Sequence, residues 1–113
     1  MEDWETYRLE LRKRIKDLGV LTPDTLKGVM TIGNAGKKTN RLDEKTKELI
    51  SMACAVTTRC DGCISVHAKA AVEAGATEEE IAEALGVAIN LNAGAALVYS
   101  ARALDAVRGF SEI

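Results

Sequence analysis

Apolar residues recur at intervals of three and four positions along almost the whole chain, which is the spacing of one face of an α-helix. The first such face consists of Trp4, Tyr7, Leu11, Ile15 and Leu18. It predicts an amphipathic helix over residues 1–20 that stops near Gly19. Because the sequence contains no alternating β-branched run and no Asn-Gly hairpin turn, we expect an all-α fold.

Helix start signals divide the next part of the chain. Thr22 followed by Pro23 predicts a second helix, since proline is favoured at the first helical position. We expect this helix to end between Gly33 and Gly36 and to be followed by a polar, basic loop over residues 37–41.

Asp43 is the predicted cap of a third helix. The expected buried stripe of that helix is Leu49, Ile50, Ala53, Val56 and Thr57. A further helix is expected over residues 61–74, with Gly75 as its left-handed cap. Its expected inward residues are Ile64, Ala68, Ala71 and Val72.

The Thr77 to Glu80 segment has the pattern of a capping box and predicts another helix start. The residues expected on its buried face are Ile81, Leu85, Ala88 and Ile89. We expect a break at residues 92–94 and a last helix that runs to about Arg108 and ends at Gly109. The prediction is therefore a helical domain of about six helices.

No charged residue occurs between Ala84 and Ala101, and this segment is rich in alanine and glycine. Asn90, Asn92 and Ser100 interrupt it, so we interpret it as buried helix and expect no membrane insertion. Small residues let helices approach closely, and a short chain offers few helices to cover them. We therefore expect a symmetric homo-oligomer.

The chain has 113 residues and a mass of 12.1 kDa, which predicts a single domain over residues 1–113. Fifteen basic and 17 acidic residues give a net charge of -2, and aromatic residues make up only 4%. Nucleic-acid binding is not expected, because it requires a basic excess or stacking aromatics. The acidic start lacks an apolar signal core, so we expect a cytoplasmic protein.

The candidate chemistry lies in eight residues, where Cys60, Cys63 and His67 form a C-x2-C-x3-H pattern. Residues three and four apart share a helix face, so the three side chains are expected near one stripe. A helix N-terminus favours the thiolate form of both cysteines, and the imidazole of His67 is placed to act on Cys63, one turn away.

Several interpretations of this cluster remain open from the residues alone. A Cys-x-x-Cys pair in a cytosolic protein is typically a redox or metal site. A zinc site would need Cys54 as a fourth ligand, yet Cys54 lies in an apolar run and is expected to be a small core residue. Inert packing is the third interpretation. Covalent haem is excluded, because Ile64 and not histidine follows Cys63.

Three stretches of the chain resemble the carboxymuconolactone decarboxylase-like superfamily, and within it the alkylhydroperoxidase D-like branch. They are Lys45-Thr46-Lys47-Glu48-Leu49-Ile50, Cys60-Asp61-Gly62-Cys63-Ile64-Ser65-Val66-His67 and Ala74-Gly75-Ala76-Thr77-Glu78-Glu79-Glu80-Ile81. The resemblance covers about residues 25–108. Spacing alone leaves the role of Glu48 ambiguous, since a straight helix would place it about 120° from Cys60.

The resemblance implies an all-α fold that assembles as trimers or hexamers. It implies that Glu48 and His67 form a proton relay, that Cys63 attacks a peroxide, and that Cys60 resolves the product to a disulfide. No cofactor or metal beyond this Cys60–Cys63 disulfide is implied. A lipoylated or other dithiol protein is the implied reductant.

This chain also departs from its relatives. Some peroxidase members carry a second histidine just before the second cysteine, where this chain has Gly62, and decarboxylase members generally lack the cysteine pair. The predicted function is a thiol-dependent alkyl hydroperoxidase, a peroxiredoxin-type oxidoreductase. The alternatives are a general thiol–disulfide oxidoreductase and a metal-binding or structural helical oligomer.

Overall fold

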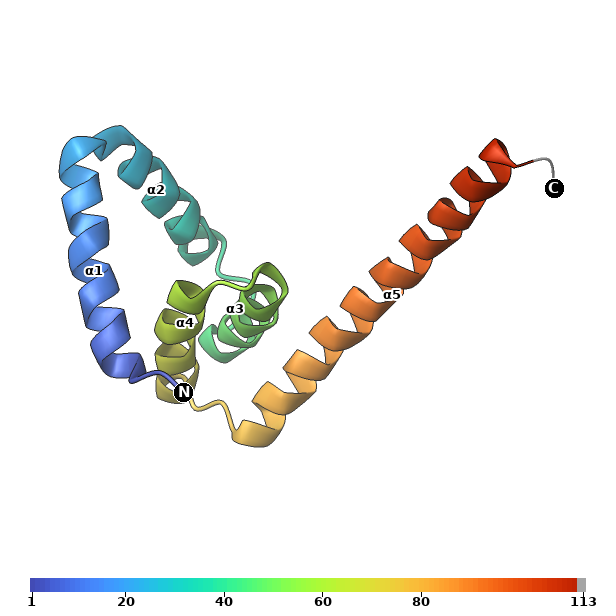
Figure 1. Ribbon diagram of the computed structural model, residues 1–113. Helices are drawn as coiled ribbons and strands as arrows, with labels where there is room; N and C mark the ends of the chain where they lie inside the picture. The colour runs from blue at the N-terminus through green and yellow to red at the C-terminus, as the bar shows by residue number, and fades with distance from the viewer. Residues whose placement is uncertain (112–113) are drawn as a thin grey trace.

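The computed structural model describes residues 1–111, and this part of the chain is all-α, as predicted (Figure 1). It contains five helices and no strand. The helices are α1 (Trp4–Leu21), α2 (Pro23–Thr39), α3 (Glu44–Thr58), α4 (Asp61–Glu73) and α5 (Glu78–Phe110).

Thr22 is the N-cap of α2, as predicted, but its side chain makes no capping bond to a backbone amide; the other predicted caps are confirmed by their hydrogen bonds. The Asp43 carboxylate accepts a hydrogen bond of 2.8 Å from the Thr46 amide at the start of α3. At the start of α5, the Glu80 amide donates to Thr77 Oγ1 at 3.1 Å, and the Thr77 amide donates to Glu80 Oε1 at 3.0 Å. This is the reciprocal capping box that the sequence predicts. Gly75 has the expected left-handed conformation, with φ of +86°.

Two predicted helix ends are wrong. Helix α1 continues through Gly19 to Leu21, and the side chain of Leu26 packs where a side chain at Gly19 would lie. Helix α2 continues through the expected loop to Thr39. The helix includes Lys37 and Lys38, because lysine is a good helix former. It ends before Asn40, whose left-handed φ of 46° does not continue an α-helix.

The predicted break at residues 92–94 is also wrong, so α5 is one helix of 33 residues and the count is five instead of six. Asn92 does not interrupt the helix, because its amide donates within it to the carbonyl of Ala88 at 2.9 Å. The same amide lies 3.1 Å from Thr57 Oγ1 of α3, which ties the two helices together.

Helix α3 lies at the centre of the fold and packs against α4 and α5, while α1 packs against α2 and α4. The buried residues are Met52, Ala55, Ser65, Ala71 and Ala88. Several predicted inward residues are instead exposed, namely Ile50, Thr57, Val72 and Ile89. The reason is that the helices of one chain cover only a narrow strip of one another.

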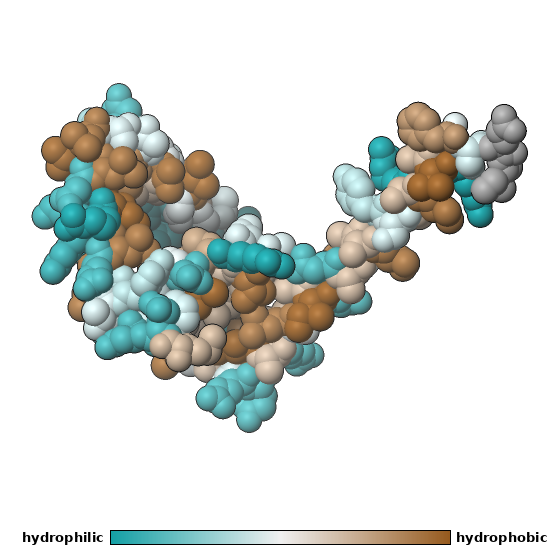
Figure 2. Space-filling model, in the orientation of Figure 1, coloured by the Kyte–Doolittle hydropathy of each residue, from teal (hydrophilic) through white to brown (hydrophobic). Residues whose placement is uncertain are grey.

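Helix α5 projects far beyond the other helices (Figure 1). The radius of gyration is 18.7 Å, whereas a compact domain of this length has about 13 Å. Large apolar side chains are exposed along α5 at Val87, Ile89, Leu91, Leu97, Val98, Tyr99, Leu104, Val107 and Phe110. Figure 2 shows apolar surface continuing from the body of the molecule onto this helix.

Helix α5 is also long and apolar enough to cross a membrane by length and composition. It is the one helix in residues 1–111 that meets this test, and core helices of soluble proteins meet it as well. The fold therefore leaves the projecting part of α5, beyond its packing against α3, uncovered by the other helices of the chain.

Candidate redox site

The cysteine pair lies at the start of α4, where the chain turns from α3 through Arg59, a residue with a left-handed φ of 54°. Cys60 is the N-cap, and its Sγ accepts a hydrogen bond of 3.1 Å from the Cys63 amide. Ser65 Oγ donates to the carbonyl of Gly62 at 2.8 Å, inside the same turn. These bonds fix the backbone between the two sulfur atoms.

The two thiols differ in acidity, although the sequence predicted that the helix N-terminus would act on both alike. The Cys63 thiol and the Cys63 backbone amide both hydrogen-bond to Cys60 and lower its pKa. The pKa of Cys63 is raised by its hydrogen bond to Cys60, by partial burial and by the negative charge on Cys60. Of the two thiols, Cys60 is therefore the one that loses its proton first.

Glu48 and His67 are in direct contact across the α3–α4 packing. His67 Nδ1 lies 2.7 Å from Glu48 Oε2, and the exposed fractions of the two side chains are 35% and 15%. An ionised carboxylate can only accept, so Nδ1 carries the proton and Nε2 is left to accept another. This arrangement orients the imidazole so that Nε2 can act as a base.

Cys60, Cys63 and His67 line one cavity of about 650 Å³. Its remaining walls are mostly apolar and come from α1, α2 and α4, through Tyr7, Leu11, Ile15, Val29 and Val66. Both cysteines are half-buried and their thiols are free. The cavity therefore presents two reactive sulfurs and an imidazole to an apolar space that is open to solvent.

The structure thus brings together the four residues proposed from the sequence. Cys60, Cys63 and His67 share the cavity, and Glu48 supports His67 from α3.

Cys54 does not belong to this cluster, and its prediction as a core residue is wrong. Its side chain is exposed on a face of α3 that no other helix of this chain covers. Within residues 1–111, no three histidine, cysteine, aspartate or glutamate side chains are grouped so that they could hold a metal ion. The zinc interpretation, which needed Cys54 as a ligand, has no geometric support.

Sequence reasoning missed the contribution of α1 to this cavity. Tyr7, Leu11 and Ile15 were predicted to share an apolar helix face, and the structure places all three in the cavity wall. The only signal in the sequence was that apolar face, which does not say what it covers.

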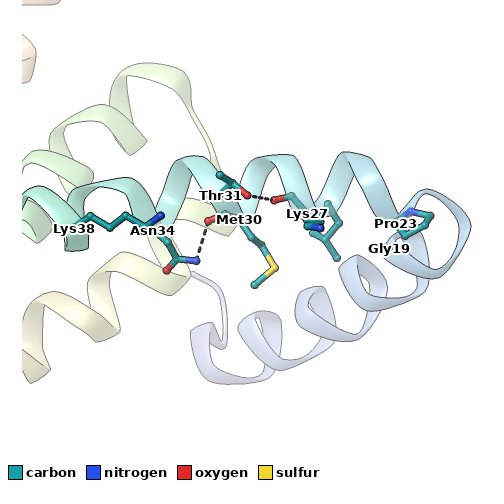
Figure 3. Close-up of a pocket in the computed structure, with 8 residues that line it drawn as sticks. Gly19, Pro23, Lys27, Met30, Thr31, Asn34 and Lys38 are labelled. Carbon is teal, nitrogen blue, oxygen red and sulfur yellow. Dashed lines mark hydrogen bonds between the residues drawn. The ribbon is translucent and has the colours of Figure 1, made fainter.

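A second cavity of about 580 Å³ lies along α2, on the side of Met30, Thr31 and Asn34 (Figure 3). Thr31 Oγ1 and the Asn34 amide donate to carbonyls of their own helix, those of Lys27 and Met30. Its lining includes no cysteine, histidine or carboxylate, so it offers none of the groups of the redox site.

Comparisons with known proteins agree with this fold. An uncharacterized protein of Haemophilus influenzae is 51% identical over 104 residues, which are 92% of each chain. The crystal structure of a carboxymuconolactone decarboxylase family protein from Legionella pneumophila is similar over 99% of this chain and 100% of that chain, with a TM-score of 0.73 and 35% identity. A crystal structure from Methanobacterium thermoautotrophicum covers 72% of this chain and 91% of its own, with a TM-score of 0.65 and 40% identity.

The family model of the carboxymuconolactone decarboxylase family matches residues 23–106, which include α2, α3, α4 and most of α5. The match contains the cysteine pair, His67 and Glu48, and it leaves out α1. By this match and by its structural similarity, the chain belongs to the carboxymuconolactone decarboxylase family.

Proposed function

We propose that this protein is a thiol-dependent peroxidase that reduces organic hydroperoxides with the Cys60–Cys63 pair. The observation that carries the proposal is the 2.7 Å contact between His67 and Glu48 beside two free thiols in one cavity. A carboxylate-supported imidazole next to a thiol is the arrangement that activates a sulfur nucleophile.

In the first step, His67 takes the proton of Cys63 and the resulting thiolate attacks the terminal oxygen of the hydroperoxide. The O–O bond breaks, Cys63 becomes a sulfenic acid, and the alkoxide leaves with the proton held by His67. Glu48 stabilises the imidazolium between these two transfers. The raised pKa of Cys63 makes such a base necessary at neutral pH.

In the second step, the Cys60 thiolate attacks the Cys63 sulfur and expels its oxygen as hydroxide, which takes up a proton to become water. The lowered pKa of Cys60 suits this role, because the resolving sulfur reacts as the thiolate, and the Cys63 backbone amide still donates to it after Cys63 is oxidised. Together the two thiols lose two electrons and the hydroperoxide becomes an alcohol and water. A lipoylated or other dithiol protein would return the two electrons by disulfide exchange.

A matched pair of cysteine variants tests this proposal. Cys63→Ser should abolish hydroperoxide consumption, whereas Cys54→Ser should retain it, because Cys54 lies outside the cavity. Full activity in Cys63→Ser would refute the assignment of Cys63 as the attacking sulfur.

A second candidate function is disulfide exchange with a protein substrate, and the lowered pKa of Cys60 favours it. A charged sulfur at a helix N-cap is the usual attacking group in thiol–disulfide exchange. This function predicts faster reduction of insulin disulfides than of hydroperoxides at equal enzyme concentration. The peroxidase predicts the opposite order.

We further propose that the working form is a symmetric homo-oligomer, a trimer or a hexamer, assembled through α5. The single chain exposes 9137 Å² of surface, while a compact monomer of its mass exposes about 6,000 Å². The excess, about 3,000 Å², is within the range of large permanent interfaces. It includes the apolar side chains of α5, which further copies of this chain would cover.

A further inference from the structure

Helix α1 is not part of the family match, yet it forms one wall of the redox cavity. Tyr7, Leu11 and Ile15 follow one another at helical spacing along this wall. Tyr7 is held in place by Trp4, whose ring lies 6.0 Å away in an edge-on arrangement. Most charged residues of α1 are exposed, and its apolar face is the part that lines the cavity with the cysteines.

Leu11 of α1 packs against the turn between the two cysteines. A Cβ atom added to Gly62 would lie 2.6 Å from Leu11 Cδ2, well inside van der Waals contact. Leu11 therefore fills the space that a side chain between the two cysteines would need. Leu11 can pack in this way only because position 62 has no side chain.

This contact has a chemical consequence. A polar or titratable side chain at position 62 would place a hydrogen-bonding group at the mouth of the site. In this chain Leu11 occupies that space. The lining also includes Tyr7 and the carboxylate of Asp61, but from Leu11 the wall is apolar along α1 to Ile15 and across to Val29 and Val66. Hydrogen peroxide has no apolar surface to bury against such a wall, whereas the organic group of an alkyl hydroperoxide gains binding free energy by burying its apolar surface there.

We propose that Leu11 and Ile15 of α1 are specificity-determining residues, which hold the apolar group of a hydroperoxide while its oxygens reach Cys63. This inference rests on the proposed peroxidase function. It assigns substrate selection to the helix that precedes the family match and leaves the chemistry to α3 and α4.

The test compares Leu11→Asn with Leu9→Asn. Asparagine has a similar size to leucine but is polar, and Leu9 is a 44% exposed residue of α1 that does not line the cavity. The readout is the ratio of kcat/KM for cumene hydroperoxide to that for hydrogen peroxide. Leu11→Asn should lower this ratio about fivefold through loss of apolar contact, and Leu9→Asn should leave it unchanged.

Ile15→Asn provides a second variant, because Ile15 is 42% exposed and its replacement disturbs packing less. It should lower the same ratio about twofold, through loss of apolar contact at the cavity wall. Helical circular dichroism checks that each variant is folded. Equal ratios in wild type, Leu11→Asn and Ile15→Asn would overturn the proposal.

A second readout does not require peroxidase activity. In a Cys54→Ser background, alkylation of the pair by N-cyclohexylmaleimide is compared with alkylation by N-(2-hydroxyethyl)maleimide. Leu11→Asn should lower the ratio of the alkylation rate with the apolar reagent to that with the polar reagent. An unchanged ratio would contradict the proposal that Leu11 binds apolar groups beside the cysteines. A lowered ratio in a protein that consumes no hydroperoxide would support the wall and refute the proposed peroxidase.

Discussion

His67 and Glu48 are 19 positions apart in sequence and belong to different helices, yet Nδ1 of one lies 2.7 Å from Oε2 of the other. The contact joins α3 and α4 directly behind the cavity that holds the two cysteines. It gives the imidazole a fixed orientation and a countercharge, which are the two properties that a general base needs before it can take a proton from Cys63.

Replacing Glu48 by glutamine separates these two properties. The amide oxygen can still accept the Nδ1 hydrogen bond, so the ring keeps its orientation, but the countercharge is lost. We expect hydroperoxide consumption to slow by about tenfold to a hundredfold, within the usual contribution of acid–base catalysis. Stopped-flow rates on Glu48→Gln measure this. A rate equal to wild type would mean that the carboxylate only positions the ring or is irrelevant.

The unequal acidity of the two thiols predicts their order of reaction with iodoacetamide. Because the pKa of Cys60 is lowered, its thiolate forms at lower pH, and its alkylation should reach half-maximum below the pH of an ordinary thiol, about 8.5. Alkylation of Cys63, whose pKa is raised, should follow at higher pH. Mass spectrometry of the labelled peptides across a pH series distinguishes them.

Cys63→Ala is the control for that series. It removes the thiol that donates to Cys60 and keeps the backbone amide, so the Cys60 profile should move upward in pH without returning fully to the ordinary value. A Cys60 profile that is the same in wild type and Cys63→Ala would contradict the hydrogen-bonding explanation.

Assembly through α5 predicts that one charge on its exposed apolar face disrupts the oligomer. Leu97 is 74% exposed and lies in the projecting part of the helix. Leu97→Glu should therefore change the folding stability of the single chain little, but it should weaken the interface strongly, because it buries a charge there. Light scattering should show a multimer of wild type and a smaller species of the variant. Glu78→Gln, at the start of α5, is the control and should leave the mass unchanged. A monomeric wild type would refute the assembly.

The capping box of α5 makes a local contribution to stability that can be measured separately. Thr77→Ala removes the side-chain oxygen that accepts from the Glu80 amide, and such a change costs about 1 kcal/mol. Urea unfolding should show this loss, and Thr77→Ser, which keeps the hydroxyl, should show little of it. A full loss in the serine variant would assign the effect to the methyl group instead.

The parts of the fold that were predicted correctly are those decided within one helical turn. Asp43 and Thr77 cap their helices because each bonds to an amide three residues on, and neither depends on the rest of the chain. The continuity of α5 was missed, although one of its causes is local: the Asn92 amide bonds to the Ala88 carbonyl four residues back. Its second bond, to Thr57 of α3, joins residues 35 positions apart, and no local pattern contains that contact.

The site shows the same division. The spacing of Cys60, Cys63 and His67 predicted a shared stripe, because all three belong to the start of one helix. Glu48 was ambiguous by spacing, since helical angles do not apply across the turn at Arg59. The contact of Leu11 with position 62 joins two residues that are 51 positions apart in the sequence. It could not be predicted without the packing of α1 on α4.

The most direct measurement is a count of free thiols in Cys54→Ser before and after one equivalent of cumene hydroperoxide per chain. We expect both remaining thiols to disappear together and to return on treatment with a dithiol, as formation and reduction of a Cys60–Cys63 disulfide requires. Thiols that survive the peroxide, or a loss that a dithiol does not reverse, would contradict the proposed redox pair.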